Sequence, residues 1–418
     1  MNRYHRYQNV NSYWYDEVPD HWKKTKNKYV FHQDKKVVGS SWEDYVLLTM
    51  GKFGVKPRDM DGGGKFPASF ENYQVVTPNQ IIFCLFDIDE TPRTVGKSSD
   101  HGMITSAYDV FSTSTGNDPQ FWTYFYQMID DHKGLRPYYT GLRKVVRSET
   151  FMGIEVFSPP IEEQKLISRY LDKKTNQIDS LVEKIQKKIE LLKEQRTTLI
   201  NHFVTKGLDP NVEMKDSGVE WIGEIPKHYT LQKIKYLFRE KKSKSNLELN
   251  SGSISFGQVV YKDDESILES TKESYQEVLE GEFLINPLNL NYDLKSLRIG
   301  KSKINVVVSQ GYIILQILEG QYPDYFEYLL RKFDVVHMKS LGQGVRQTIS
   351  FKNLKNEELI IPPIEEQKEI VCELNLRTNQ IDRLCKVEEK RISLFQEYRQ
   401  SLISSVVTGK VRVTEDMI

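Results

Sequence analysis

A long internal repeat constrains the fold of this chain more than any other feature of its sequence. The heptapeptide PPIEEQK at residues 159–165 recurs without change at residues 362–368. The offset of 203 residues continues into the pentapeptide TNQID at residues 175–179 and 378–382. Further upstream, a set of residues recurs at an offset of 207: Trp14, Glu17, Pro19, His21, Lys26, Lys28, Tyr29 and Phe31 match Trp221, Glu224, Pro226, His228, Lys233, Lys235, Tyr236 and Phe238. We therefore expect two tandem copies, each a variable head followed by a similar tail.

Each tail is predicted to form one long helix. Neither Pro nor Gly occurs between Glu162 and Val204, and at 1.5 Å per residue such a helix would be ~64 Å long. Apolar residues recur at heptad spacing, so the two stripes should bury each other or pack on partner helices. Glu388 stands where the first tail has Ile185. The predicted packing residues are Ile178, Leu181, Ile185, Leu192 and Leu199 in the first tail, and Ile381, Leu384, Ile392, Phe395 and Leu402 in the second.

The heads have a different pattern. Short apolar runs such as residues 81–85 and 306–308 are rich in β-branched and aromatic side chains, and Gly, Asn and Pro lie between the runs. This pattern is typical of short strands mixed with short helices. The two heads share only scattered positions. Similar tails with divergent heads indicate a fixed spacer that carries two different recognition domains.

Composition limits the function classes. The chain has 418 residues with 58 Lys and Arg against 58 Asp and Glu, so bulk charge does not predict nucleic-acid binding; such binding would need locally sorted charge or a basic partner. Its three cysteines form no CxxC pair, which disfavours a zinc site or a disulfide framework and suits a reducing cytoplasm. No secretory signal and no membrane-spanning run is evident.

The tripeptide Gly-Lys-Ser occurs once in each head, at residues 96–98 and 300–302. It resembles the end of a phosphate-binding P-loop, but the earlier glycine that such a loop needs is absent from both copies. A β-turn with an exposed lysine is the favoured interpretation. Since both heads carry the motif, a phosphate contact by Lys97 or Lys301 stays open as a second interpretation.

Two other basic segments are candidates for DNA contact. Residues 51–65 of the first head form a Gly-rich basic segment, equally compatible with a solvated loop and with a loop that enters a DNA groove. Near the end of each head, a paired glycine precedes Arg143-Lys144 in the first copy and Arg346-Gln347 in the second. Arg and Gln side chains are suited to bidentate contacts with bases, although a plain polar loop is about equally compatible. The candidate DNA-binding residues are Lys52, Lys56, Arg58, Lys65, Lys97, Arg143, Lys144, Lys301, Gln343, Arg346 and Gln347.

No catalytic or metal-ligating constellation was found in the sequence. Residues 158–161 have the Pro-Pro of an amino-methyltransferase loop, but they lack its leading Asn or Asp and its aromatic residue, so a helix start is favoured. His21 and His228 match across the copies and lie beside aromatic residues, which indicates structural packing. We predict no metal site, no bound cofactor and no enzymatic activity of this chain's own.

With its paired PPIEEQK and TNQID motifs and the segment EWIGEIP at residues 220–226, the chain resembles, over essentially its full length, the specificity subunit of type I restriction–modification systems. The resemblance implies an α+β fold in which two mixed α/β target-recognition domains are separated by two long helices that pair as an antiparallel coiled coil with pseudo-two-fold symmetry. The implied domains are residues 1–157 and 211–360, and the implied helical spacers are residues 158–210 and 361–418.

The resemblance also implies a function for the chain. A non-catalytic subunit of this family binds an asymmetric, bipartite double-stranded DNA target and recruits two methyltransferase subunits, which transfer a methyl group from S-adenosylmethionine to adenine N6. It can also recruit restriction subunits that use ATP and Mg²⁺. No membrane partner is expected, and the location would be the bacterial or archaeal cytoplasm. A tandem coiled-coil scaffold that binds proteins rather than DNA is the alternative, and neutral charge slightly favours it.

The segments that open the two copies differ in sequence and in what precedes them. The first copy opens with a weaker version of the second copy's motif, NSYWYDEVP at residues 11–19. Only residues 1–10 precede it, whereas residues 207–218 link the first tail to the second head. How the edge of the first head is closed is therefore not evident from the sequence.

Overall fold

The computed structural model describes residues 2–51, 54–59, 67, 69–141, 144–263, 267–288, 297–342 and 348–418. The chain divides into two compact units: residues 1–186 with 389–418 form unit 1, and residues 187–388 form unit 2. Both long helices contribute to both units, so the domain boundaries expected at residues 157, 210 and 360 stay predictions. No helix among the described residues is long and apolar enough to cross a membrane.

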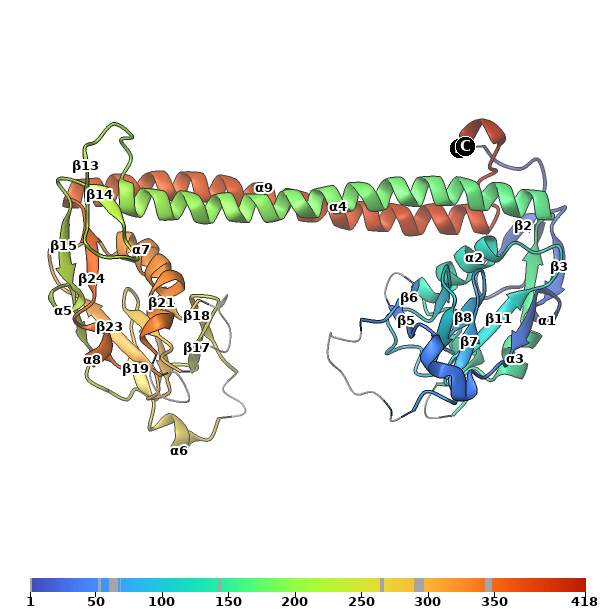
Figure 1. Ribbon diagram of the computed structural model, residues 1–418, viewed down its shortest axis with the longest axis horizontal. Helices are drawn as coiled ribbons and strands as arrows, with labels where there is room; N and C mark the ends of the chain where they lie inside the picture. Colours follow the sequence, from blue (N-terminus) through green and yellow to red (C-terminus); the bar gives the residue numbers. More distant parts are fainter. Residues whose placement is uncertain are drawn as a thin grey trace. The chain divides into compact units, whose positions relative to one another are not determined.

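Unit 1 is built on a four-stranded antiparallel sheet of order β4-β11-β8-β9 (Figure 1). Its helices are α1 (Asn27–Val30), α2 (Pro119–Asp131) and α3 (Ser148–Gly153), together with parts of α4 (Ile161–Lys206) and α9 (Ile364–Val407). Its strands are β1 (Tyr7–Asn9), β2 (Glu17–Pro19), β3 (Lys23–Lys26), β4 (Phe31–Asp34), β5 (Leu48–Gly51), β6 (Gly54–Pro57), β7 (Gln74–Val76), β8 (Ile81–Phe83), β9 (Val95–Lys97), β10 (Gly102–Ile104), β11 (Asp109–Thr113) and β12 (Glu155–Ser158).

Unit 2 repeats this architecture with a sheet of order β16-β23-β20-β21. Its own helices are α5 (Ile234–Leu237), α6 (Glu269–Lys272), α7 (Pro323–Val336) and α8 (Phe351–Leu354). Its strands are β13 (Met214–Asp216), β14 (Glu224–Pro226), β15 (Thr230–Lys233), β16 (Phe238–Glu240), β17 (Gly252–Ser255), β18 (Gln258–Tyr261), β19 (Gln276–Val278), β20 (Phe283–Ile285), β21 (Ile299–Lys301), β22 (Val306–Val308), β23 (Ile313–Ile317) and β24 (Glu358–Ile361).

Both faces of each sheet are buried, which explains the continuous apolar runs in the sequence. Successive residues of a strand point to opposite faces. In β8, Ile81 and Phe83 belong to the main core of unit 1, which α2 covers, whereas Ile82 belongs to a smaller core shared with β6 and β10. In β20, Phe283 and Leu284 divide between two cores in the same way. The two heads therefore share one fold despite their divergent sequences.

The edge of the first head is closed by the N-terminal segment. β1 pairs antiparallel with β2, as β13 pairs with β14 in unit 2. The Tyr7 hydroxyl donates to the Gly409 carbonyl oxygen at 3.1 Å, and the Arg412 amide donates to the Asn2 carbonyl oxygen at 2.8 Å. The two ends of the chain together thus take the place that the 207–218 linker has in unit 2.

The long helices run antiparallel within each unit. In unit 2, Lys188 Nζ lies 2.7 Å from Glu388, and Arg196 Nε lies 3.0 Å from Asp382, so the partner numbers fall as those of α4 rise. In unit 1, Arg399 Nε lies 3.1 Å from Asp179. The Arg196 and Arg399 pairs are related by the 203-residue repeat. These features confirm the predicted α+β tandem-repeat fold with two long antiparallel helices.

The packing seam of these helices differs from the predicted stripe at two positions. Leu181 and Leu384 are 43% and 48% exposed, because Val182 and Cys385, one residue further on, take the seam positions. Glu388 lies on the seam, with a side chain only 5% exposed that accepts from Lys188. Of the other predicted packing residues, Ile178, Ile185, Ile381 and Leu402 are buried, and Leu192, Leu199, Ile392 and Phe395 are half-buried.

Candidate nucleic-acid interface

The repeated heptapeptide fastens each long helix to its head through a buried glutamine. Gln164 Nε2 donates to the Pro159 carbonyl at 2.9 Å, and its Oε1 accepts from the Asp118 amide at 2.8 Å, at the start of α2. In unit 2, Gln367 bonds the Pro362 carbonyl at 3.0 Å and the Tyr322 amide at 3.2 Å, at the start of α7. Both glutamines are 1% exposed. We call this arrangement the glutamine clamp.

The second glutamate of the heptapeptide binds the segment that opens each copy. Glu163 accepts hydrogen bonds from Tyr4, from His21 Nε2 at 2.7 Å and from Trp22 Nε1 at 3.1 Å. Glu366 accepts from His228 Nε2 at 2.8 Å and from Tyr229 at 2.5 Å. Burial and the neighbouring carboxylate raise the pKa of the Tyr4 and Tyr229 hydroxyls well above the usual range. Each matched histidine is thus tied to its long helix, as a structural role requires.

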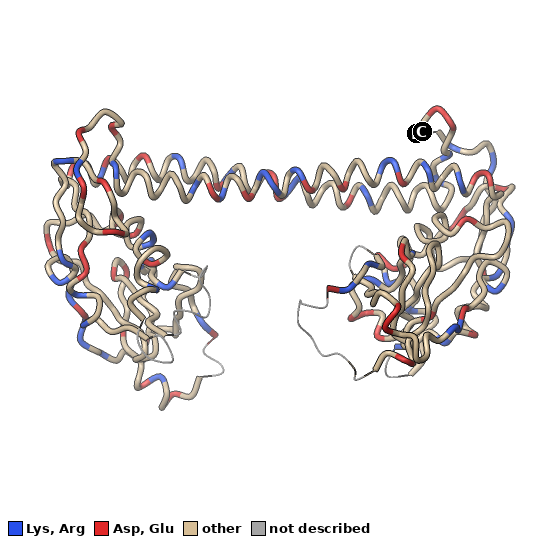
Figure 2. The backbone as a smooth tube through the Cα atoms, viewed as in Figure 1, with Lys and Arg blue, Asp and Glu red and all other residues tan. Residues whose placement is uncertain are grey.

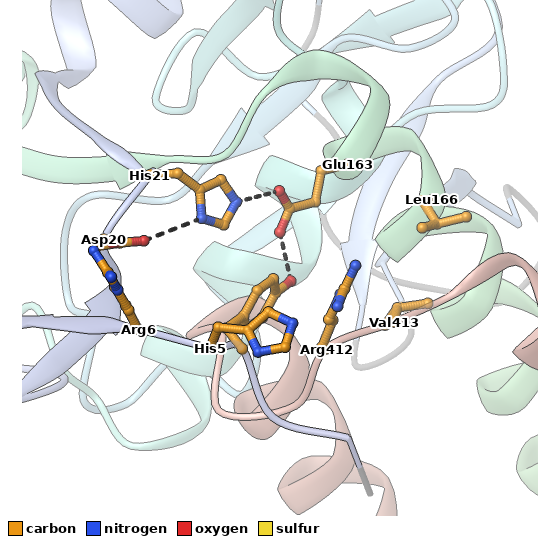
Figure 3. Close-up of a pocket in the computed structure, with 9 residues that line it drawn as sticks. His5, Arg6, Asp20, His21, Glu163, Leu166, Arg412 and Val413 are labelled. Carbon is orange, nitrogen blue, oxygen red and sulfur yellow. Dashed lines mark hydrogen bonds and ion pairs between the residues drawn. The ribbon is translucent and has the colours of Figure 1, made fainter.

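A hollow of about 490 Å³ lies on the outer side of this contact in unit 1 (Figure 3). Arg6, Arg412 and His5 line it together with Asp20 and the Glu163 contact, so its lining mixes both signs of charge. The first turn of α4 and the two chain ends form its walls. Glu163 already accepts three hydrogen bonds there, so the hollow is the solvent-facing side of a structural contact.

Removal of a clamp glutamine should destabilise its head. Gln367→Ala leaves the Tyr322 amide and the Pro362 carbonyl without their buried partner, which should lower the free energy of unfolding of unit 2 by about 2 kcal/mol. Hydrogen exchange of the α7 amides measures this loss. The control is Lys368→Ala at the next position, which removes only an exposed pair with Glu365 and should cost below ~0.5 kcal/mol. Equal, small effects of both changes would show that the clamp does not stabilise the head.

The Gly-Lys-Ser segments are strands, so the expected β-turn is wrong. Their Gly and Lys residues are the last two residues of β9 and of β21. A β-hairpin of the same head passes close to each glycine. A Cβ on Gly300 would lie 2.5 Å from the Gly257 carbonyl oxygen, and a Cβ on Gly96 would lie 3.1 Å from the Val55 amide nitrogen. Ser98 and Ser302 are fully buried. Packing of the hairpin on the sheet therefore explains why both copies carry this tripeptide.

The two lysines of these segments lie in different surroundings. Lys301 is 13% exposed, and its Nζ contacts the Asp324 carboxylate and lies 3.7 Å from Glu327 Oε2. Its charge is therefore already neutralised within unit 2. Lys97 is half-buried at the end of β9, beside β6, the strand that carries the exposed Lys56. Of the candidate cations, Lys56 and Lys97 thus lie on adjoining strands.

Lys144 belongs to an ion-pair cluster at the end of the first head. Its Nζ lies 2.9 Å from Asp89 and 3.2 Å from Glu90, and Arg136 Nε lies 3.1 Å from Asp89. Hydrogen bonds from Lys144 and Arg136 lower the pKa of Asp89 to about 2. Lys144 is thus paired within the head, at 43% exposure.

The remaining candidates are placed only in part. Arg58 is half-buried just after β6, and its amide donates to the Leu47 carbonyl at 2.8 Å. The other predicted DNA-contacting residues lie outside the described residues: Lys52, Lys65, Arg143, Gln343, Arg346 and Gln347. Lys and Arg are interspersed with Asp and Glu throughout each unit (Figure 2). The part of the chain that the structure describes holds no cluster of His, Cys, Asp and Glu fit for a metal ion.

Comparisons with known proteins show which family part of the chain is similar to. A family model described as the type I restriction modification DNA specificity domain matches residues 227–391. The putative type I restriction enzyme MjaX specificity subunit of Methanocaldococcus jannaschii is 26% identical over 267 residues, or 61% of this chain and 59% of the relative. The MjaVIII specificity subunit of the same organism is 25% identical over 290 residues, 64% of each protein. The matches span about three fifths of the relatives' own length.

Solved structures share the fold. A chain from a structural study of the assembly and conformational transition of the type I R-M system superposes with a TM-score of 0.68 at 12% identity, covering 94% of this chain and 99% of that one. The HsdS subunit from Thermoanaerobacter tengcongensis superposes with a TM-score of 0.50 at 14% identity, covering 94% and 98%. At these identities the likeness concerns the fold alone.

The duplicated heads and the pair of long helices are thus a fold that this chain shares with these solved structures. Over these matched residues, the chain is similar to the specificity subunits of type I restriction–modification systems. These likenesses support the resemblance carried by the PPIEEQK and TNQID motifs.

Proposed function

We propose that this chain reads an asymmetric, bipartite double-stranded DNA target and directs N6-adenine methylation, and restriction, by partner subunits in host defence. One observation carries the proposal: two heads with the same strand order, fastened by the same clamp, differ in their remaining sequence. A repeated scaffold with divergent surfaces suits two unlike half-sites. Bases would be read by the heads, and phosphate contacts would fix their register.

We further propose that α4 and α9 set the spacing between the half-sites. α4 has 46 residues and α9 has 44, and the antiparallel ion pairs of each unit fix the register of one helix against the other. The length of the two helices would then determine the number of unread base pairs between the half-sites.

The chemistry is proposed to reside in partners. Two copies of a methyltransferase subunit would bind S-adenosylmethionine and flip the target adenine out of the duplex, so this chain need not contact that base. Restriction subunits would bring ATP and Mg²⁺. The partners' basic surfaces would supply the charge that this neutral chain lacks. The complex would act in the cytoplasm, where the host DNA lies.

Arg346 is proposed to contact a guanine through its guanidinium fork. Arg346→Ala should relax one base position of the target at a cost of ~1–3 kcal/mol. Sequencing of methylated sites in a host that carries the variant measures this, with Lys352→Ala, a change in α8 of the same head, as control. An unchanged motif would refute the assignment of Arg346.

A gel-shift separates this function from that of a protein-binding scaffold. The chain co-expressed with its methyltransferase should retard duplex DNA that contains the target and should release it as salt rises. A complex that assembles normally but retards no duplex of any sequence would favour the scaffold.

A further inference from the structure

One exposed residue pair recurs in both heads without a structural reason. α1 carries Lys28 and Tyr29, and α5 carries Lys235 and Tyr236, related by the 207-residue offset. The tyrosines are 63% and 65% exposed. Each lysine Nζ lies over the neighbouring ring, 5.0 Å and 5.1 Å from its centroid. We call these two sites the Lys–Tyr knobs.

Packing or a hydrogen bond to a long helix explains the repeated phenylalanines and histidines of these segments but not the knobs. Phe31 and Phe238 are 1% exposed in the two main cores. His21 and His228 bind the glutamates of the long helices. Among the described residues, the hydroxyls of Tyr29 and Tyr236 have no hydrogen-bond partner. Two heads that otherwise diverge thus keep the same exposed aromatic side chain beside the same cation.

The surroundings of the knob suit a protein partner with a carboxylate. In unit 1, Tyr29 borders a hollow of about 330 Å³. Its lining combines apolar residues, among them Val30, Pro159 and Pro160, with polar and basic residues such as Asn117 and Lys23. Tyrosine beside apolar residues is typical of binding hot spots. Lys28 and Lys26, and their repeats Lys235 and Lys233, form no ion pair among the described residues. The unpaired charge is positive, so a complementary surface is acidic.

In unit 1, the knob lies at the opposite edge of the sheet from β6, the strand that carries the candidate residue Lys56. α1 packs beside β4, one edge of the sheet, whereas β6 packs beside β9, the opposite edge. In unit 2, α5 packs beside β16, and β18 packs beside β21. Three strand spacings of ~4.8 Å separate the two edges of either sheet.

We propose that each Lys–Tyr knob docks one copy of the same protein, which offers a carboxylate to the lysine and an apolar surface to the tyrosine. The inference rests on the proposed function, because the methyltransferase is the partner expected twice. Identical sites in the two heads allow identical copies to bind one asymmetric chain.

The stoichiometry of the purified complex tests this proposal. Native mass spectrometry of the chain co-expressed with its methyltransferase should show two copies for the wild type. Tyr29→Ala or Tyr236→Ala should leave one copy, and the double variant should leave none. A loss of about 30-fold in affinity at the altered site is the size expected of a hot-spot tyrosine. Tyr261→Ala is the matched control: it is 58% exposed, is not repeated and lies on β18, and it should retain two copies.

Three outcomes overturn the proposal. A double variant that still binds two copies with unchanged affinity shows that the knobs are not docking sites. A double variant that keeps both copies but loses steepness in the salt dependence of DNA binding assigns the knobs to phosphates instead. A wild-type chain that binds no methyltransferase overturns this inference together with the proposed function, whereas the first two outcomes leave the proposed function standing.

Discussion

A variant in which α4 and α9 each carry one additional heptad should methylate a target whose half-sites lie about three base pairs further apart. Seven helical residues add ~10 Å, and duplex DNA rises ~3.4 Å per base pair. A heptad preserves the seam spacing, so both helices can still pair. The insertions belong after Gln186 and after Glu388, where the chain passes from one unit to the other. Sequencing of methylated sites in the host measures the spacing.

The size of this effect makes it decisive for the spacing proposal. The original motif should disappear from the methylated sites and a lengthened motif should replace it, with both half-sites unchanged. The control carries the same heptad in α4 alone, which breaks the register of the Arg196 and Arg399 pairs and should abolish methylation. Methylation at the original spacing by the doubly extended chain would contradict the proposal.

Head 2 should become more stable as the pH falls from 7 to 5, because of Asp334. This side chain is fully buried, and burial raises its pKa to about 6, although the Arg298 and Ile299 amides donate to it. The folded state therefore binds a proton more tightly than the unfolded state does. Stability from this group is present below pH ~4 and is lost as the pH rises through about 6, with a total of about 3 kcal/mol.

Urea unfolding of unit 2 at pH 5, 6 and 7 measures the effect. Between pH 7 and 5 the wild type should gain about 1 kcal/mol. Asp334→Asn retains an oxygen for the two amides but has no charge to bury, so its stability should be nearly flat over this range. Glu280→Gln, an exposed change in the same unit, should keep the wild-type slope. A wild-type slope in Asp334→Asn would show that another group titrates.

The long helices could be predicted from the sequence because their determinants are local. Pro-Pro, two glutamates and the absence of helix breakers define where α4 and α9 begin and how far they run. Which residues pack between the two helices is harder to predict from the sequence. Leu181 and Val182 are both apolar, and only tertiary packing determines that Val182 is the one that lies between the helices. The Arg196–Asp382 and Arg399–Asp179 pairs were missed, although all four residues recur at the 203-residue offset.

Interpretations of single motifs failed where the determinants are distant in sequence. Gly96 and Gly300 are required by hairpins that cross the sheet, and nothing beside them in the sequence indicates that contact. The glutamine clamp likewise joins Gln164 to Asp118, 46 residues earlier. Lys144 and Lys301 were predicted from the sequence to be available for DNA contact. Their side chains instead pair with acidic residues from other elements of the same head.

Single-molecule sequencing of N6-methyladenine in the host genome, with this gene deleted and then restored, tests whether this chain directs methylation to a bipartite target. One asymmetric motif, made of two unlike half-sites around an unread spacer, should lose methylation on deletion and regain it on restoration. A methylation pattern that does not change on deletion, or a motif that is continuous and symmetric, would contradict the claim.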